Sequence, residues 1–476
     1  MNNLSPTDRR ALLGQFFTPP AIAEFMASLF AGPFPQAVRL LDPGAGHGAL
    51  ATAFAARWQA ERPEGGTLAV DAYELDPLVL GLLGDAMSAL GEAPGATADL
   101  LSGDFVALAS ALIREERGPR YSHAILNPPY RKIGVGSPER AALRSMGLET
   151  VNLYAGFVAL AVALLARGGQ AVAIIPRSFC NGPYYERFRG FVLGRASLRR
   201  VHLFHARDKA FASDGVLQEN VILLLERGAA QGDVIVSTSS DDTFSDLEER
   251  VHPFERIVFP DDPQQFIHLP TDHDDDLLEA MSFACSLADL GVTVSTGPVV
   301  DFRMKDDLRP DPEEGTAPLL YPGHFAGAGL LWPRPGFKKP NAIRDTAATR
   351  KWLYPGGFYA VAKRFSAKEE ARRVVAHVVD PAALAPGPIG FENHLNVFHQ
   401  KRGPLPEELA RGLATFLNSG VVDAYVRRFN GHTQVNATDL RSMRYPSRRD
   451  LLALGAWAKG KSPTPDAIDS RLAEFA

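Results

Sequence analysis

The chain has 476 residues, of which 46% are hydrophobic and 22% charged, and its formal net charge is −5. These values are typical of a globular protein with more than one domain, and the acidic balance argues against a protein that coats nucleic acid non-specifically. The two cysteines, Cys180 and Cys285, lie far apart and lack zinc-ligand spacing. We therefore predict neither a disulfide framework nor a metal site.

The N-terminal segment has no apolar core of the kind found in secretory signals. The longest apolar run, 155–166, is shorter than the ~20 residues that span a bilayer, and it is predicted as a buried helix. We expect a cytoplasmic protein that does not enter a membrane.

Short apolar runs alternate with helix-length segments through the first half of the chain. The runs are predicted as buried strands over 38–42, 68–74, 121–127, 170–176, 198–204 and 220–227. This alternation predicts an α/β fold with a mostly parallel sheet and helices on both faces. Such sheets bind ligands beyond the carboxyl ends of their strands.

The composition changes after about residue 227. Residues 231–290 are polar, acidic and rich in loop-forming residues, and the chain beyond 290 has many Pro, Gly and aromatic residues between short β-like runs. We predict a first domain over 1–230, a connecting segment over 231–290 and a mixed α+β domain over 291–476.

A glycine-rich sequence, DPGAGHG, follows the first predicted strand and precedes a helix. Gly44 and Gly46 allow a tight turn and a close approach of the backbone to a ligand, and the helix N-terminus beyond them presents free N–H groups. Glu74 ends the next strand, where a carboxylate can accept from ribose hydroxyls. Asp104 ends a third strand-like run, and Phe105 beside it suits an adenine ring. The pattern predicts a nucleoside pocket.

The sequence NPPY, residues 127–130, directly follows a buried strand. An amino group conjugated to an aromatic ring is a poor nucleophile because its lone pair is delocalised. Two fixed acceptors, the Asn127 side-chain oxygen and the Pro128 carbonyl, would stabilise the charge that develops on such a nitrogen during attack. Tyr130 would stack on the ring. The sequence therefore predicts transfer of a group to an aromatic amine.

The motifs LGQFFTPPAIAEFM, DPGAGHG, YELDP, GDF and NPPY occur in this order. In this order they resemble the gamma class of S-adenosylmethionine-dependent N6-adenine DNA methyltransferases, with a Taq-type catalytic domain. The C-terminal segment 416–446 is similar to the end of PstI/BsuBI-type modification methylases. The resemblance implies a Rossmann-like class I methyltransferase domain followed by a target-recognition domain.

The resemblance also implies two sets of site residues. The set for the cofactor S-adenosylmethionine is Gln15, Phe16, Thr18, Asp42, Gly44, Gly46, Glu74, Asp104 and Phe105. The set for a flipped-out target base is Asn127, Pro128, Tyr130 and Phe211. Phe211 is expected to stack on the far side of the base, and Phe204 and Phe179 are its alternatives.

The implied activity is site-specific methylation of adenine N6 in double-stranded DNA, as the modification enzyme of a type II restriction–modification system. A cognate endonuclease would act separately, and a monomer would suffice because one strand is treated per visit. Basic and amide side chains within 427–441 are expected to read the DNA. The alternatives are an RNA or protein-amide N-methyltransferase with the same pocket, and an inactive DNA-binding subunit.

Overall fold

The computed structural model describes residues 14–115, 121–204, 219–270, 283–326, 329–366, 370–430 and 433–475. The chain divides into two compact units, Met1–Leu269 and Pro270–Ala476. The first unit therefore continues past residue 230, where the sequence placed the end of the first domain, and includes most of the predicted connecting segment.

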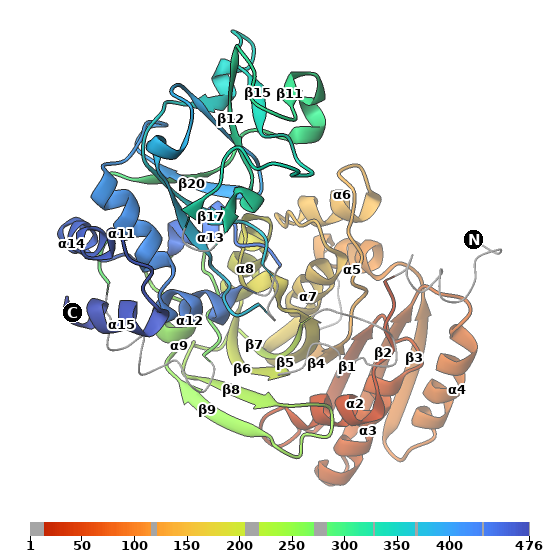
Figure 1. Ribbon diagram of the computed structural model, residues 1–476. Helices are drawn as coiled ribbons and strands as arrows, with labels where there is room; N and C mark the ends of the chain where they lie inside the picture. Colours follow the sequence, from red (N-terminus) through yellow and green to blue (C-terminus); the bar gives the residue numbers. More distant parts are fainter. Residues whose placement is uncertain are drawn as a thin grey trace. The chain divides into compact units, whose positions relative to one another are not determined.

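The first unit is built on a nine-stranded sheet with the order β3-β2-β1-β4-β5-β7-β6-β8-β9 (Figure 1). Its strands are β1 (Ala37–Pro43), β2 (Thr67–Glu74), β3 (Ala96–Ser102), β4 (Tyr121–Leu126), β5 (Leu165–Pro176), β6 (Ala196–Phe204), β7 (Asn220–Arg227), β8 (Val234–Ser239) and β9 (Glu248–His252). The first five strands in chain order run parallel, and β7 is antiparallel to both β5 and β6. The strand order reverses between β1 and β4, which is where such sheets bind ligands.

Helices cover both faces of this sheet (Figure 1). Residues of α2 (Pro20–Ser28), α3 (Ala49–Glu61) and α4 (Leu80–Gly91) pack in one core layer. Residues of α5 (Phe105–Arg114), α7 (Leu153–Leu164) and α8 (Glu186–Leu193) pack in the other. The α/β prediction is confirmed, as is the buried helix: α7 is apolar all round, and only Ala163 of its residues is not fully buried. Within the described ranges, no helix is long and apolar enough to cross a bilayer.

Strand β8 lies in a stretch whose composition suggested a loop. It alternates between Val234 and Val236, which enter the apolar core, and Ser237 and Ser239, which are buried on the opposite face. The two serine hydroxyls lie 3.0 and 3.2 Å from the ring nitrogens of buried His202 on β6. These serines make the strand look polar in the sequence. They can be buried because His202 on the neighbouring strand is their hydrogen-bond partner.

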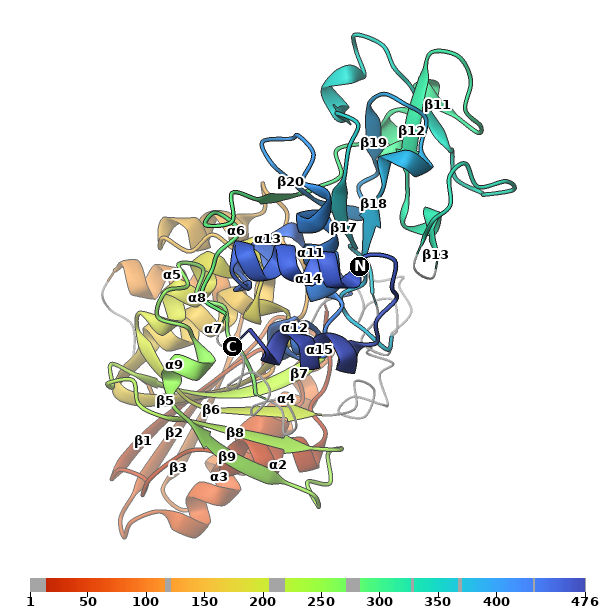
Figure 2. The same ribbon diagram turned by 60° about the vertical axis from the view of Figure 1, so that its left-hand side comes forward.

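The second unit contains a four-stranded antiparallel sheet, β10 (Thr293–Thr296), β20 (Leu395–His399), β17 (Tyr359–Lys363) and β18 (Ala376–Val379), in that spatial order. A five-stranded sheet of short strands follows the order β11 (Leu308–Arg309), β15 (Ala342–Arg344), β12 (Thr316–Leu320), β19 (Ile389–Phe391) and β16 (Leu353–Tyr354). Helices α11 (Glu407–Leu417) and α14 (Arg448–Ala458) lie side by side (Figure 2). Gly412 and Gly455 permit this packing, because a Cβ on either would collide with the backbone of the facing helix.

Candidate active site

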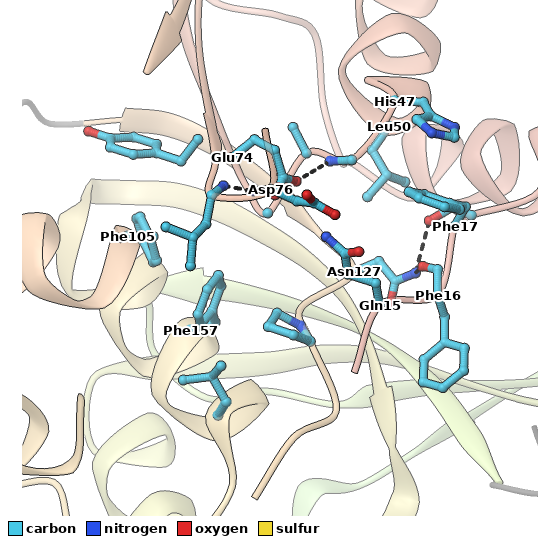
Figure 3. Close-up of a pocket in the computed structure, with 18 of the residues that line it drawn as sticks. Gln15, Phe16, Phe17, His47, Leu50, Glu74, Asp76, Phe105, Asn127 and Phe157 are labelled. Carbon is cyan, nitrogen blue, oxygen red and sulfur yellow. Dashed lines mark hydrogen bonds between the residues drawn. The ribbon is translucent and has the colours of Figure 1, made fainter. Parts of the chain in front are cut away.

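A pocket opens in the first unit at the carboxyl ends of β1, β2 and β4. All of its described lining residues come from the segment 15–157. They are Gln15, Phe16, Phe17, Thr18, Gly44, Ala45, Gly46, His47, Ala49, Leu50, Tyr73, Glu74, Leu75, Asp76, Gly103, Asp104, Phe105, Asn127, Pro129, Arg131, Glu139, Leu153 and Phe157. Figure 3 shows Glu74 and Asp76, Phe105 and Phe157, and Asn127 with Gln15 and Phe16 at different sides of this space.

The floor of the pocket is the glycine turn after β1. Gly44 and Gly46 have φ of 75° and 56°, in the left-handed region that favours glycine. The turn is held against β2, because the amides of Gly44 and Ala45 donate to the Tyr73 carbonyl at 2.8 and 2.9 Å. A Cβ at Gly46 would lie 3.1 Å from the Phe17 ring. Glycine therefore keeps the turn compact beneath the pocket.

Glu74 is clamped by backbone amides where β2 ends. Its Oε2 accepts from the Gly46 amide at 2.9 Å, and its Oε1 accepts from the amides of Leu75 and Asp76 at 2.8 and 2.7 Å (Figure 3). The side chain is buried but lines the pocket. A carboxylate has about four acceptor positions, so the three amides orient Glu74 and leave capacity to accept from a ligand hydroxyl.

Asp42 lies at the end of β1 and is fully buried. Its Oδ2 accepts from the Ala51 amide in the first turn of α3 at 3.2 Å, and its Oδ1 has no hydrogen-bond partner in the described part of the chain. Burial, with a smaller contribution from the nearby Glu74 charge, raises the pKa of the Asp42 carboxyl to about 8 against the opposing effect of the Ala51 amide. Asp42 does not reach the pocket wall.

Asp104 and Phe105 form another wall of the pocket. Asp104 is the N-cap of α5, and its Oδ1 accepts from the amides of Val106 and Ala107 at 2.8 and 3.4 Å. The Phe105 ring centroid lies 5.2 Å from that of Tyr73 and 5.0 Å from that of Phe157. This wall offers a carboxylate beside an aromatic surface.

Asn127 is held in one orientation by the segment that precedes α2. Its Nδ2 donates to the Phe16 carbonyl at 2.8 Å and to Thr18 Oγ1 at 3.0 Å. The Tyr130 hydroxyl donates to Asn127 Oδ1 at 3.0 Å and also lies 3.3 Å from the Ile174 carbonyl. Burial raises the pKa of the Tyr130 phenol well above its usual value, so the hydroxyl keeps its proton. The Asn127 oxygen retains one lone pair for another donor.

The predicted site residues divide by position. Those on the pocket wall are Gln15, Phe16, Thr18, Gly44, Gly46, Glu74, Asp104, Phe105 and Asn127. Asp42 and Pro128 are buried behind it, and Tyr130 contacts Asn127 from beside it. Phe211 lies outside the described residues. Its two alternatives, Phe204 and Phe179, are buried in the apolar cores on opposite faces of the sheet.

Several lining residues were not predicted from the sequence. The Phe17 ring stacks on His47 with centroids 3.9 Å apart, Asp76 lies two residues after Glu74, and Phe157 comes from α7. Phe17 and Asp76 stand inside the motifs LGQFFTPPAIAEFM and YELDP, so proximity to Phe16 and Glu74 was an available signal. Phe157 gives no such signal, because it sits in a helix that is apolar on every side.

Comparison with known proteins places this site in a family. A family model described as Eco57I restriction-modification methylase matches residues 109–211, which include the NPPY sequence. The chain is 48% identical over 472 residues to the Type II methyltransferase M.BsuBI of Bacillus subtilis, covering 97% of this chain and 94% of that protein. It is 41% identical over 452 residues to the Type II methyltransferase M.PstI of Providencia stuartii, covering 93% and 88%.

The chain belongs to the Type II methyltransferase family. The structure of the Type IIL restriction-modification enzyme MmeI in complex with DNA shares its fold, with a TM-score of 0.55, 11% identity and coverage of 92% of this chain and 70% of that one. As a Type II methyltransferase of the restriction–modification kind, the protein methylates DNA with S-adenosylmethionine as methyl donor. These relatives give no support to an RNA or protein-amide acceptor, nor to an inactive DNA-binding subunit.

The pocket of this Type II methyltransferase fits its cofactor. The glycine turn, which a Cβ at Gly46 would crowd, leads into the N-terminus of α3. The first amides of a helix have no intrahelical acceptor, and here the Ala51 amide donates to Asp42. Carboxylates at two successive strand ends, Glu74 and Asp104, line the pocket and suit a ligand with ribose hydroxyls and an exocyclic amine. Residues with the chemistry that S-adenosylmethionine requires therefore line one cavity.

Proposed function

We propose that this Type II methyltransferase is adenine-specific and methylates the N6 amino group of an adenine flipped out of double-stranded DNA. The observation that carries the proposal is the fixed amide of Asn127. Its Nδ2 is held by Phe16 and Thr18, so its oxygen is the atom that faces a donor. An oxygen acceptor in that place is suited to an amine with two N–H bonds.

In the proposed mechanism, Asn127 Oδ1 and the Pro128 carbonyl accept from the two N–H bonds of the target amine. They orient its lone pair and stabilise the positive charge that grows on the nitrogen as the new N–C bond forms. When bound, S-adenosylmethionine would supply the methyl group of its sulfonium, whose S–C bond would break as the N–C bond forms, so that a neutral thioether leaves. The amine then loses a proton to water, and neither a metal ion nor a covalent enzyme intermediate is needed.

The cofactor would be held by the same wall residues that were predicted from the sequence. Glu74 accepts from the ribose hydroxyls, while Asp104 and Phe105 receive the adenine. Gln15, Phe16 and Thr18 line the methionine end beside Asn127. In the proposed arrangement the methionine end of the cofactor would lie next to the acceptor amide, which would bring donor and acceptor together.

The target base must leave the duplex to reach this pocket, because N6 is paired inside the helix. Unstacking costs a few kcal/mol, and stacking on Tyr130 with the two acceptor oxygens offsets it. Phe211 is proposed as the second stacking ring. The segment 291–476, which lies within the second unit, is proposed to recognise the DNA sequence.

The test is to incubate the enzyme with S-adenosylmethionine and unmethylated genomic DNA, and to measure N6-methyladenine, N4-methylcytosine and 5-methylcytosine in the nucleoside digest by mass spectrometry. N6-methyladenine is the expected product, and sequencing of the modified DNA gives the recognition sequence. A cytosine product would overturn the proposal.

Asn127→Ala is expected to lower kcat by about 10²–10³, the usual effect of removing one preorganised electrostatic contact. Cofactor affinity, measured by calorimetry, should change little because the backbone contacts of the pocket remain. Full activity in Asn127→Ala would contradict the role of this oxygen.

We also infer that the enzyme acts as a monomer in the cytoplasm and that a cognate endonuclease cleaves the unmodified sequence as a separate protein. One strand is methylated per visit, so a single pocket is sufficient. Analytical ultracentrifugation with a duplex of the mapped sequence tests the first point: a complex of two chains on one duplex would contradict it.

A further inference from the structure

Asn220, the first residue of β7, is a buried amide that no described side chain or backbone group pairs with. Its side chain is 3% exposed, and neither Nδ2 nor Oδ1 has a hydrogen-bond partner among the described residues. Buried polar groups are nearly always paired, because leaving them unpaired destabilises the fold. A leucine of similar size would pack there without this penalty. Asn220 therefore needs an explanation other than the stability of the free protein.

The register of the sheet puts Asn220 at the same edge as Asn127. Asn220 pairs with Pro176, the last residue of β5, and β5 pairs Ala173 with Leu126, the last residue of β4. Asn127, the residue after Leu126, thus lies at the carboxyl end of β4. Asn220, although on β7, lies beside the carboxyl end of β5. One strand lies between them, so they are two strand spacings, about 10 Å, apart across the sheet. Asn220 is also level with a position two residues farther along β5 than Asn127 is.

The two asparagines also lie on one face of the sheet. Side chains alternate between faces along a strand, and Ile125 of β4 and Ile222 of β7 belong to the same core layer as Ile174 of β5. Asn127 is two residues beyond Ile125, and Asn220 is two residues before Ile222. Both amides are therefore on the face that α2 and α3 cover.

Tyr130 contacts both Asn127 and the strand that lies between the two amides. Its hydroxyl lies 3.0 Å from Asn127 Oδ1 and 3.3 Å from the carbonyl of Ile174, which is on the strand between the two asparagines. This contact puts the Tyr130 hydroxyl beside β5, the strand that separates the two asparagines.

We propose that Asn220 is a specificity-determining residue of the target-base pocket, whose amide donates to a ring nitrogen of the flipped adenine. The proposal rests on the proposed function. Once Asn127 and Pro128 engage the amino group, the remaining polar atoms of adenine are the ring nitrogens N1, N3 and N7, which are all acceptors. Nδ2 of Asn220 is a buried donor for which the described residues supply no acceptor, and the arriving base would supply one.

The experiment pairs variants with altered bases. Duplexes that carry the mapped recognition sequence are made with adenine, 1-deazaadenine, 3-deazaadenine or 7-deazaadenine at the target position, and kcat/KM is measured for each. The wild-type enzyme is expected to lose about tenfold on one of the three analogues, the effect of one hydrogen bond with its buried partner left unpaired. Asn220→Leu is expected to lose about tenfold on adenine and nothing further on that analogue.

Thermal unfolding separates this role from a structural one. Asn220→Leu should melt at the same temperature as the wild type or higher, because it removes an unpaired buried amide. Ser110→Ala is the matched control: its hydroxyl on α5 is also buried, has no partner within the described ranges and does not line the pocket. This control should keep full kcat/KM on every duplex.

The proposal is overturned if no analogue is penalised in the wild type, or if Asn220→Leu keeps the wild-type penalty. Asn220→Asp, which keeps the shape and removes the donor, replaces the leucine variant if that one does not fold, and the same two criteria apply. N6-methyladenine formed on the natural duplex supports the proposed function independently, so a failure confined to the analogues concerns Asn220 alone.

Discussion

Asp42 and Asn127 stand at the ends of neighbouring strands, yet their surroundings act on them differently. Asn127 is neutral, and its amide is held by hydrogen bonds from both sides. Asp42 is fully buried, and burial favours the protonated form of its carboxyl more strongly than the one backbone amide it accepts from favours the ionised form. The free protein therefore carries a proton at Asp42 over a pH range in which an exposed aspartate would be ionised.

This burial makes stability depend on pH. The pKa of the Asp42 carboxyl is about 8 in the fold, against 3.8 for an ordinary aspartate. Between those values the folded state binds a proton that the unfolded state has released, so the free energy of unfolding falls as pH rises through this window. A pKa difference of one corresponds to about 1.4 kcal/mol. Urea unfolding of the cofactor-free protein at pH values of about 5, 6, 7 and 8 measures the decline.

Asp42→Asn removes the titration while keeping the shape of the side chain. The variant is expected to lose less stability than the wild type between about pH 5 and pH 8, and to be the more stable protein at the upper end of this range. Parallel curves for the two proteins would show that Asp42 is ionised throughout, and the explanation by burial would then be wrong.

Pocket residues could be predicted from the sequence where a polar side chain directly follows an apolar strand. Glu74, Asp104 and Asn127 are polar residues that directly follow apolar strands, and parallel strands bring such residues to one edge. Their catalytic and binding roles stay predictions. The Phe17–His47 stack was not predictable, because it joins the segment before α2 to the glycine turn, and no local pattern encodes that contact.

At the scale of elements, six of the nine strands of the first unit, β1, β2, β4, β5, β6 and β7, were predicted because they form largely buried, apolar runs. Strand β5 begins five residues earlier than the predicted run, at Leu165, because a bulge admits the polar residues 167–170. The helix–strand junction at Leu164 thus follows from tertiary pairing, which a pattern of apolar residues does not reveal.

The glycine turn gives a test at this scale. Gly46→Ala places a side chain at φ 56° and 3.1 Å from the Phe17 ring. Displacing Phe17 should weaken S-adenosylmethionine binding about tenfold or more, the effect of overpacking a tight contact. Isothermal titration calorimetry measures the affinity.

Gly168→Ala is the control for backbone strain. Gly168 has φ 78°, but a Cβ there would meet nothing within 4 Å, and the residue does not line the pocket. This variant should lose about 1–2 kcal/mol of stability, the cost of a left-handed conformation, with cofactor affinity unchanged. Equal losses of affinity in both variants would mean that strain, and not the displaced ring, weakens binding.

At the scale of the whole molecule, the second unit was the harder part to predict. Its polar side chains looked like a set of base readers, but many hold the unit together. Arg427 donates to Asp423 at 2.6 Å, Asn430 donates to the Gln434 carbonyl at 2.8 Å, and Asn436 caps α13 (Ala437–Ser442). Sequence alone does not separate a side chain that contacts DNA from one that closes a loop, since both uses require the same donors.

Exposed basic residues of this unit are better candidates for binding phosphates. Lys401 and Arg449 are both exposed. Replacing both with glutamine should weaken DNA binding and lower the slope of log K against log salt by about one for each phosphate that the variant no longer neutralises. Fluorescence anisotropy across a salt series measures this slope. Arg427→Gln removes one positive charge from a side chain that is paired with Asp423 and should leave the slope unchanged.

Every described residue that lines the cofactor pocket comes from the first 157 positions of the chain, whereas the second unit begins at Pro270. If the second unit recognises the DNA sequence, as proposed, mutations that retune which sequence is bound can accumulate in one stretch of the gene while the chemistry encoded in another stays intact. Such a layout lets a lineage acquire new targets by exchanging its C-terminal portion, and it suggests that chimaeras joined near position 270 would inherit methylation from one parent and target choice from the other.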